Sequence, residues 1–225
     1  MVNMSRTPYE LVVLDMAGTT VVDDGLVESA FARAWDVVRP ATTKDAALEH
    51  VRATMGQSKI EVFRAIADEE TAQRLNAEFE RALQDLIADG RCRPIEGAQQ
   101  AIRTLRAAGL KIAFTTGFSR PTADAILRSL GWDGLADVVL TPSDAGRGRP
   151  APDLNLTALL RTGTSAVAAM VAVGDTESDA RSGRAAGAGL VVGVLTGALD
   201  EQTLRAAGAD VVLASVAELP AALGL

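Results

Sequence analysis

The feature that most constrains the fold is a regular alternation, beginning after Pro94, of short apolar runs with segments of helical spacing. The apolar runs predict strands at 111–115, 138–141, 170–173, 190–194 and 210–213. The segments between them predict helices at 97–108, 121–130, 153–160 and 177–186, and a short helix follows the last strand. Strands that alternate with helices form parallel sheets, because each crossover helix returns the chain to the same end of the sheet. The sequence therefore predicts an α/β fold built on a doubly wound parallel sheet.

One further predicted strand, at 11–14, stands apart from this alternation. It is followed by segments that have helical spacing only, at 26–39, 44–55, 59–68 and 72–89. The economical arrangement is an all-helical cap inserted into the α/β core after the first strand. We therefore predict a core domain of 1–22 and 94–225 and a cap domain of 23–93, with hinges at Asp23-Asp24-Gly25 and Arg93-Pro94.

Composition excludes several classes of protein. The net charge of -7 and the absence of a Lys/Arg block argue against a nucleic-acid partner. No segment approaches the roughly 20 apolar residues of a membrane span, and the first ten residues lack the apolar stretch of a signal peptide. We therefore expect no membrane partner and a cytoplasmic location.

A homodimer that forms through the cap is possible. The segment 26–39, with Phe31 and Trp35, could supply the contact, although this apolar stripe could instead pack inside the cap.

A carboxylate follows the first strand directly. Asp15 ends the apolar run and opens the sequence Asp-Met-Ala-Gly-Thr-Thr. A strand holds such a side chain rigidly at the sheet edge where α/β proteins bind ligands. Gly18 allows backbone N–H groups to approach a phosphoryl oxygen, and the Thr19 hydroxyl adds a donor. This pattern is typical of an aspartate nucleophile, although a buried strand that ends in an ordinary turn would look the same.

Other polar residues follow the later strands. Thr115 and Thr116 come after the second strand, and Asp175 and Asp179 come after the fourth. Because the carboxyl ends of parallel strands meet at one edge, these side chains are expected close to Asp15. Clustered carboxylates repel one another, and Mg²⁺ relieves that repulsion while neutralising a phosphoryl group. The alternative is that Asp175 or Ser178 simply caps the following helix.

A stiff, proline-flanked loop places a cation near this edge. Arg149 lies in Arg-Gly-Arg-Pro-Ala-Pro-Asp, just ahead of the helix at 153–160. A cation at this position would hold the attacking carboxylate and bind phosphoryl oxygens. An arginine in a loop is also often only solvated, so this interpretation depends on its order in the chain.

These motifs, taken in order, resemble the haloacid dehalogenase superfamily over essentially the whole chain. The matching positions are Asp15, Thr115, Arg149, and Asp175 with Asp179. The resemblance implies in-line attack of Asp15 on phosphorus, an aspartyl-phosphate intermediate and its hydrolysis by water. It also implies Mg²⁺ as the cofactor, bound by Asp15, the backbone carbonyl of Ala17 and Asp175, with Asp179 either as a further ligand or as a residue directly behind the ligands.

Ala17 sets this chain apart from most phosphatases of the superfamily. They have a second aspartate two residues after the nucleophile, because an alkoxide leaving group needs a proton from a general acid. Three explanations stay open: the leaving group needs no such proton, another residue supplies it, or activity is impaired. The first points to cleavage of a C–P bond in which a lysine, condensed with an aldehyde, acts as the electron sink.

A candidate lysine lies in the predicted cap. Met55-Gly56-Gln57-Ser58-Lys59-Ile60 is similar to the cap segment of phosphonatases (phosphonoacetaldehyde hydrolases), which implies that Lys59 is the Schiff-base lysine and that Gly56 borders the substrate. The Thr-Thr-Gly-aromatic run at 115–118 is also similar to phosphonatases, and it adds Thr116 and Gly117 as expected substrate-binding residues together with Arg149 and Thr19.

Three residues depart from the phosphonatase pattern. Val62 replaces a histidine, Phe118 replaces a tyrosine, and Met16 replaces a tryptophan. Part of the proton relay that an imine needs is therefore missing. The leading hypothesis is a Mg²⁺-dependent hydrolase of a small phosphonate or phosphorylated metabolite. The alternatives are an ordinary phosphatase, in which Lys59 binds the substrate anion and Asp23, Asp24 or water supplies the proton, and a non-catalytic binding or regulatory protein.

Overall fold

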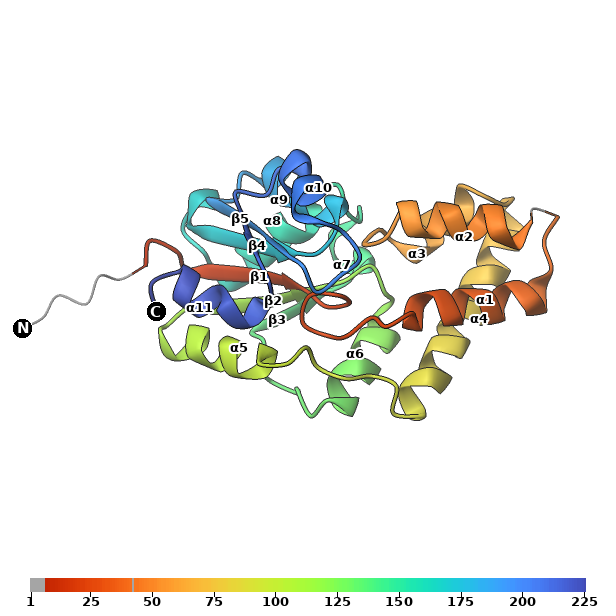
Figure 1. Cartoon of the computed structure of the whole chain (residues 1–225), viewed down its shortest axis with the longest axis horizontal. Coiled ribbons are helices and arrows are strands. Elements are labelled where there is room, and N and C mark those ends of the chain that lie inside the picture. The colour runs from red at the N-terminus through yellow and green to blue at the C-terminus, as the bar shows by residue number, and fades with distance from the viewer. Residues whose placement is uncertain (1–6, 42) are drawn as a thin grey trace, which may run out of the picture.

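The computed structural model describes residues 7–41 and 43–225 and confirms the α/β fold (Figure 1). Among these residues, parallel strands form one sheet in the order β3-β2-β1-β4-β5-β6. Their bounds are β1 (Leu11–Asp15), β2 (Lys111–Thr115), β3 (Val138–Leu140), β4 (Met170–Gly174), β5 (Leu190–Val194) and β6 (Val211–Leu213). The chain winds outward from the central β1 in both directions, so the sheet is doubly wound as predicted.

The helices lie between and beyond these strands. Their bounds are α1 (Leu26–Val38), α2 (Lys44–Ala53), α3 (Lys59–Arg64), α4 (Glu69–Ala88), α5 (Ala98–Ala107), α6 (Arg120–Ser129), α7 (Pro142–Ala145), α8 (Asp153–Thr162), α9 (Glu177–Ala186), α10 (Glu201–Ala207) and α11 (Leu219–Ala222). Figure 1 shows α8 and α9 over one face of the sheet and α5, α6 and α11 over the other. None of the helices in the described part of the chain is both long and apolar enough to span a bilayer.

The central strand is buried on both faces because its residues are apolar throughout. Successive side chains of a strand point to opposite faces. Val12 and Leu14 accordingly join the cluster that includes α5 and α6, whereas Leu11 and Val13 join the cluster that includes α8 and α9. This two-sided burial holds the end of β1, and with it Asp15, in a fixed position.

Helices α1 to α4 form a separate group beside the carboxyl ends of the strands (Figure 1). Their core is aromatic: the ring of Phe31 stacks on those of Trp35 and Phe63, at centroid distances of 5.2 and 5.8 Å. Phe79 meets Phe63 edge to face. Phe31 and Trp35 are both buried in the chain itself. The stripe that we considered for a dimer contact therefore packs inside this helical group.

The two connections between the helical group and the sheet lie side by side. The Val22 amide donates to the Arg93 carbonyl at 2.8 Å, and the Ile95 amide donates to the Thr20 carbonyl at 2.9 Å. Arg93 also pairs with Asp24 at 2.6 Å. This short antiparallel pairing of 20–22 with 93–95 lies next to the predicted boundaries at residues 23 and 93, and the division into two domains stays a prediction.

Two helices were missed in the sequence. Helix α10 buries only Leu204, so its seven residues give no helical stripe. Helix α7 has four residues and buries none of them; it forms because Pro142 and a capping box between Thr141 and Asp144 start the turn. The beginning of α4 also lies earlier than predicted, at Glu69, because the Asp68 side chain accepts from the Thr71 amide and caps the helix.

The two-sided core of the sheet predicts a large stability loss on truncation of Phe114. This side chain is fully buried and stacks on Trp132 at a centroid distance of 5.9 Å. We expect Phe114→Ala to lower the free energy of unfolding by about 3–5 kcal/mol, measured by urea denaturation. The control Leu160→Ala removes a side chain that is 76% exposed and should change stability by less than about 0.5 kcal/mol. Equal losses in the two variants would contradict this packing.

Candidate active site

Asp15 is presented by a turn whose own hydrogen bonds fix its shape. The Thr20 hydroxyl donates to the Asp15 carbonyl at 3.0 Å, and the Gly18 amide donates to the Val21 carbonyl at 2.7 Å. Gly18 has a φ of 85°, and a Cβ there would overlap the Asp175 carboxylate. Only glycine therefore allows this turn to approach Asp175.

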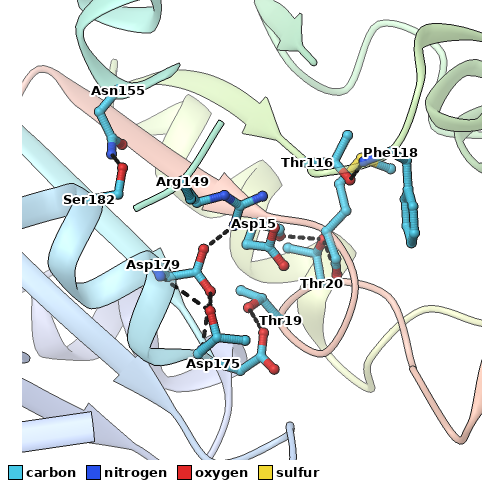
Figure 2. Close-up of polar contacts among 12 residues, drawn as sticks. Asp15, Thr19, Thr20, Thr116, Phe118, Arg149, Asn155, Asp175, Asp179 and Ser182 are labelled. Carbon is cyan, nitrogen blue, oxygen red and sulfur yellow. Dashed lines mark hydrogen bonds and ion pairs between the residues drawn. The ribbon is translucent and has the colours of Figure 1, made fainter. Parts of the chain in front are cut away.

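Three carboxylates meet at this edge of the sheet. Asp15 comes from the end of β1, Asp175 follows β4, and Asp179 lies in the first turn of α9. One oxygen from each lies within 4.8 Å of the others, and all three side chains are buried. The Thr19 hydroxyl donates to Asp175 at 2.8 Å (Figure 2). The set that the strand ends predicted is therefore brought together.

Arg149 lies among these carboxylates. Its Nη1 is 2.5 Å from Asp15 Oδ1 and also pairs with Asp179 (Figure 2). Burial works against the guanidinium charge, but Asp15 and Asp179 more than offset it and raise the pKa of Arg149. Its Nε and Nη2 are buried and have no hydrogen-bond partner among the described residues. Unpaired buried donors are costly, so this arginine has the capacity to bind an anion.

Burial also determines the direction in which the pKa values of Asp15 and Asp175 are shifted. It raises the pKa of Asp15 despite the opposing charge of Arg149, and it raises the pKa of Asp175, with the charges of Asp15 and Asp179 adding to that effect. Buried like charges at this separation favour protonation or a cation. Three oxygen donors of this kind match the ligand preference of a hard divalent cation.

The helix-capping alternative for the acidic pair is wrong in its choice of residues. Thr176 is the N-cap of α9, and its hydroxyl accepts from the Asp179 amide at 3.2 Å. Asp179 completes the capping box by accepting from the Thr176 amide at 3.1 Å. Asp179 therefore caps the helix and also pairs with Arg149, whereas Asp175 lies before the helix and faces Thr19.

Lys59 begins α3 and is buried where the helical group meets the sheet. Its Nζ lies 5.8 Å from the centroid of the Phe118 ring, and its backbone amide donates to the Gly117 carbonyl at 3.3 Å. Burial lowers the pKa of Lys59 to about 8, although the charge of Asp23 opposes this shift. A substantial fraction of this amine is therefore neutral near pH 8.

Glycines allow the helical group to approach the sheet this closely. A Cβ on Gly56 would lie 2.6 Å from the Thr176 hydroxyl, and one on Gly148 would lie 3.0 Å from the Ser58 Cβ. A Cβ on Gly117 would overlap the Gln57 carbonyl. The loop that precedes Lys59 therefore rests directly on the loops that follow β2, β3 and β4.

A small cavity lies under this contact and brings most of the predicted site residues together. Its wall is formed by Asp15, Ala17, Val27, Met55, Gly56, Lys59, Thr116, Gly117, Phe118, Asp175 and Thr176. Thr115 lies one residue before the wall, opposite Asp15 in the β1–β2 register. The roles predicted for Thr115, and for the Ala17 carbonyl as a metal ligand, stay predictions.

One part of the site was missed in the sequence. The Thr196 hydroxyl donates to the Gly18 carbonyl at 2.6 Å, and a Cβ on Gly197 would overlap Asp175. Both residues follow β5, so extending the strand-end argument by one more strand would have found them. This loop packs Asp175 against the turn that carries Asp15.

The sequence and the fold are similar to those of known hydrolases. A family model for haloacid dehalogenase-like hydrolases matches residues 9–187. The phosphonoacetaldehyde hydrolase of Bacillus cereus is 33% identical over 204 residues, which cover 84% of this chain and 76% of that protein.

Solved structures agree with these matches. A phosphonoacetaldehyde hydrolase-like protein from Oleispira antarctica superposes with a TM-score of 0.84 at 25% identity, over 97% of this chain and 92% of its own. A haloacid dehalogenase family hydrolase from Deinococcus radiodurans, with bound phosphate and sodium, superposes with a TM-score of 0.69 at 28% identity, over 97% and 96% of the two chains.

The close contact at Gly117 predicts that a methyl group there opens the site. In Gly117→Ala the new Cβ would push Gln57 away and expose Lys59 to solvent. We expect reductive methylation of Lys59, followed by mass spectrometry, to proceed at least about tenfold faster, because local opening of the contact gives the reagent access to the buried amine. Lys44 and Lys111, the other lysines of the chain, are internal references.

The control for this experiment is Gly131→Ala. Gly131 has a φ of 64° and open space around a new Cβ, so the variant adds backbone strain without touching the site. Its Lys59 should react as in the unmodified chain. Unchanged protection of Lys59 in Gly117→Ala would contradict the closed contact.

Proposed function

Because the chain belongs to the haloacid dehalogenase-like hydrolases and to their phosphonatase-like subgroup, we propose that it hydrolyses a small phosphonate with an aldehyde group. In this proposal Asp15 attacks phosphorus and Lys59 forms an imine with the aldehyde. The observation that supports it most is the position of Lys59, a buried amine with a pKa of about 8 in the same cavity wall as Asp15.

The residues around Asp15 suit a phosphoryl group. Asp15 is the nucleophile, and the aspartyl phosphate that forms on it is later hydrolysed by water. The unpaired Nε and Nη2 of Arg149 bind phosphoryl oxygens, and Thr116 and the Gly117 backbone border them. Because Nη1 already contacts Asp15, the same guanidinium aligns the nucleophile with its target.

The buried acidic triad suits Mg²⁺. Asp15, Asp175 and Asp179 supply oxygen ligands, Thr19 orients Asp175, and we propose the Ala17 carbonyl as a further ligand. Mg²⁺ bound there would neutralise the carboxylates and the phosphoryl oxygens. The raised pKa of Asp175 means that these residues resist being charged together without a cation.

The organic part of the substrate faces the helical group, which we propose as the cap, residues 23–93. Condensation with Lys59 gives an iminium ion, so that the electrons of the C–P bond pass into an enamine when phosphorus moves to Asp15. No proton has to reach the departing carbon in that step. This explains why Ala17 can replace the usual general acid.

An ordinary phosphate monoesterase is the second candidate. Val62 is buried and Phe118 lacks a hydroxyl, so two groups that would move protons around an imine are absent from the described site. In that case Lys59 would bind the substrate anion by charge alone. We further propose a cytoplasmic location for this enzyme.

Borohydride trapping tests the imine. Incubation with phosphonoacetaldehyde and borohydride should attach a reduced two-carbon or phosphonate-bearing adduct to Lys59, located by peptide mass spectrometry. Because the neutral amine forms the imine, the trapping rate should rise with pH up to about 8 and level off above it. A lysine of ordinary pKa, about 10.4, would continue to gain rate well beyond that point.

The matched variant is Lys59→Arg, which keeps the positive charge but cannot form an imine. It should lose both the adduct and phosphate release from the aldehyde. Retention of that activity in Lys59→Arg would refute the imine and favour anion binding by Lys59.

Metal removal tests the acidic triad. Chelation should abolish phosphate release, and added Mg²⁺ should restore it. In Asp175→Asn, which leaves Thr19 a hydrogen-bond partner, we expect activity at saturating Mg²⁺ to fall by about 10²-fold or more. The control Asp200→Asn alters a distant N-cap of α10 and should keep its Mg²⁺ response. Full activity in the presence of chelator would contradict a metal site here.

A further inference from the structure

Asp23 is a carboxylate that the proposed chemistry has not yet used. It lies in the connection between β1 and α1 and lines a small cavity together with Ala17, Val27 and Phe118. Three of these residues, Ala17, Val27 and Phe118, also line the cavity that contains Asp15 and Lys59. Asp23 therefore borders the space next to the position where related phosphatases have their acid and this chain has alanine.

Asp23 and its neighbour Asp24 differ in their surroundings. Asp23 is half-buried, and its Oδ1 accepts from the Val27 amide at 3.2 Å. Asp24 faces solvent, with a side chain that is 43% exposed and a 2.6 Å ion pair to Arg93. Of these two acids, only Asp23 borders the site.

The charges of Asp23 and Lys59 also shift each other's pKa. Asp23 provides the largest opposing charge to the burial that lowers the pKa of Lys59. Burial raises the pKa of Asp23, and the Lys59 charge works in the opposite direction. The cavities that Asp23 and Lys59 line share three wall residues, and a carboxyl group with a raised pKa beside an amine with a lowered pKa is suited to exchange a proton with it.

We propose that Asp23 is the proton carrier for imine formation at Lys59, in place of the histidine that Val62 replaces. This inference depends on the proposed function. The proposed proton carrier lies in the connection between β1 and α1. It is neither at the acid position, Ala17, nor in α3, the helix that contains Val62.

The proton balance is complete with these two groups. The Asp23 carboxylate takes a proton from the Lys59 ammonium, and the neutral amine forms an N–C bond to the aldehyde carbon. The amine proton passes to the former carbonyl oxygen, which gives a carbinolamine. Protonated Asp23 then donates to that hydroxyl, the C–O bond breaks, water departs, and an iminium ion remains. Asp23 ends as the carboxylate with which it began.

The test measures the rate at which borohydride traps the Lys59 adduct with phosphonoacetaldehyde, in the full chain at one pH. Asp23→Asn keeps a side-chain oxygen that can accept from the Val27 amide, but it cannot carry a proton. We expect its trapping rate to fall by about 10²-fold. The matched control Asp24→Asn should react like the unmodified chain.

A second variant separates proton transfer from structure. Asp23→Ala leaves space next to the site, and added formate should restore at least part of its trapping rate, which a purely structural role would not allow. An unchanged rate in Asp23→Asn would overturn the inference, and so would an Asp23→Ala defect that formate does not relieve. If the unmodified chain itself gives no Lys59 adduct, the proposed function fails as well, so the two failures are distinguishable.

Discussion

The arrangement of this molecule depends on the repulsion among three buried carboxylates at the end of the central strand. Asp15, Asp175 and Asp179 lie within 4.8 Å of one another, away from solvent. Such a cluster is unfavourable unless cations and hydrogen-bond donors compensate for it. Arg149 supplies one positive charge, and the donors of Thr19 and Thr176 fix the orientation of two of the acids. The positive charge that the cluster still lacks makes the site suitable for a hard divalent cation.

The helical group contributes the second half of the site that we propose. It reaches the sheet through a contact in which Gly56, Gly117 and Gly148 have no room for a side chain. That contact buries Lys59 beside Phe118, and the burial lowers the pKa of its amine. Asp15 and Lys59 therefore belong to different parts of the chain, and the reaction that we propose requires these two parts to be in contact. Asp23 belongs to the connection between them.

The sequence predicted the parallel sheet, the position of Asp15 and the convergence of the acids, because each depends on strand ends that local patterns locate. The order of the motifs placed Arg149 correctly as well. The pairing of Arg149 with both Asp15 and Asp179 could not be predicted, since it depends on how the loop after β3 folds across the sheet edge. The burial of Lys59 could not be predicted from the sequence either, because it results from contacts between loops more than fifty residues apart in the chain. Helix α10 was missed for the opposite reason, since seven residues with one buried leucine give no pattern.

The central claim is that an imine at Lys59 replaces the acid missing at Ala17. The measurement that tests it most directly compares orthophosphate release from phosphonoacetaldehyde and from ethyl phosphate, with Mg²⁺ present. Only the first compound can form an imine, whereas the second needs a proton for its alkoxide. We predict that kcat/KM for phosphonoacetaldehyde exceeds that for ethyl phosphate by about 10²-fold or more, with acetaldehyde as the other product. Faster release from ethyl phosphate would contradict this account and identify the protein as an ordinary phosphate monoesterase.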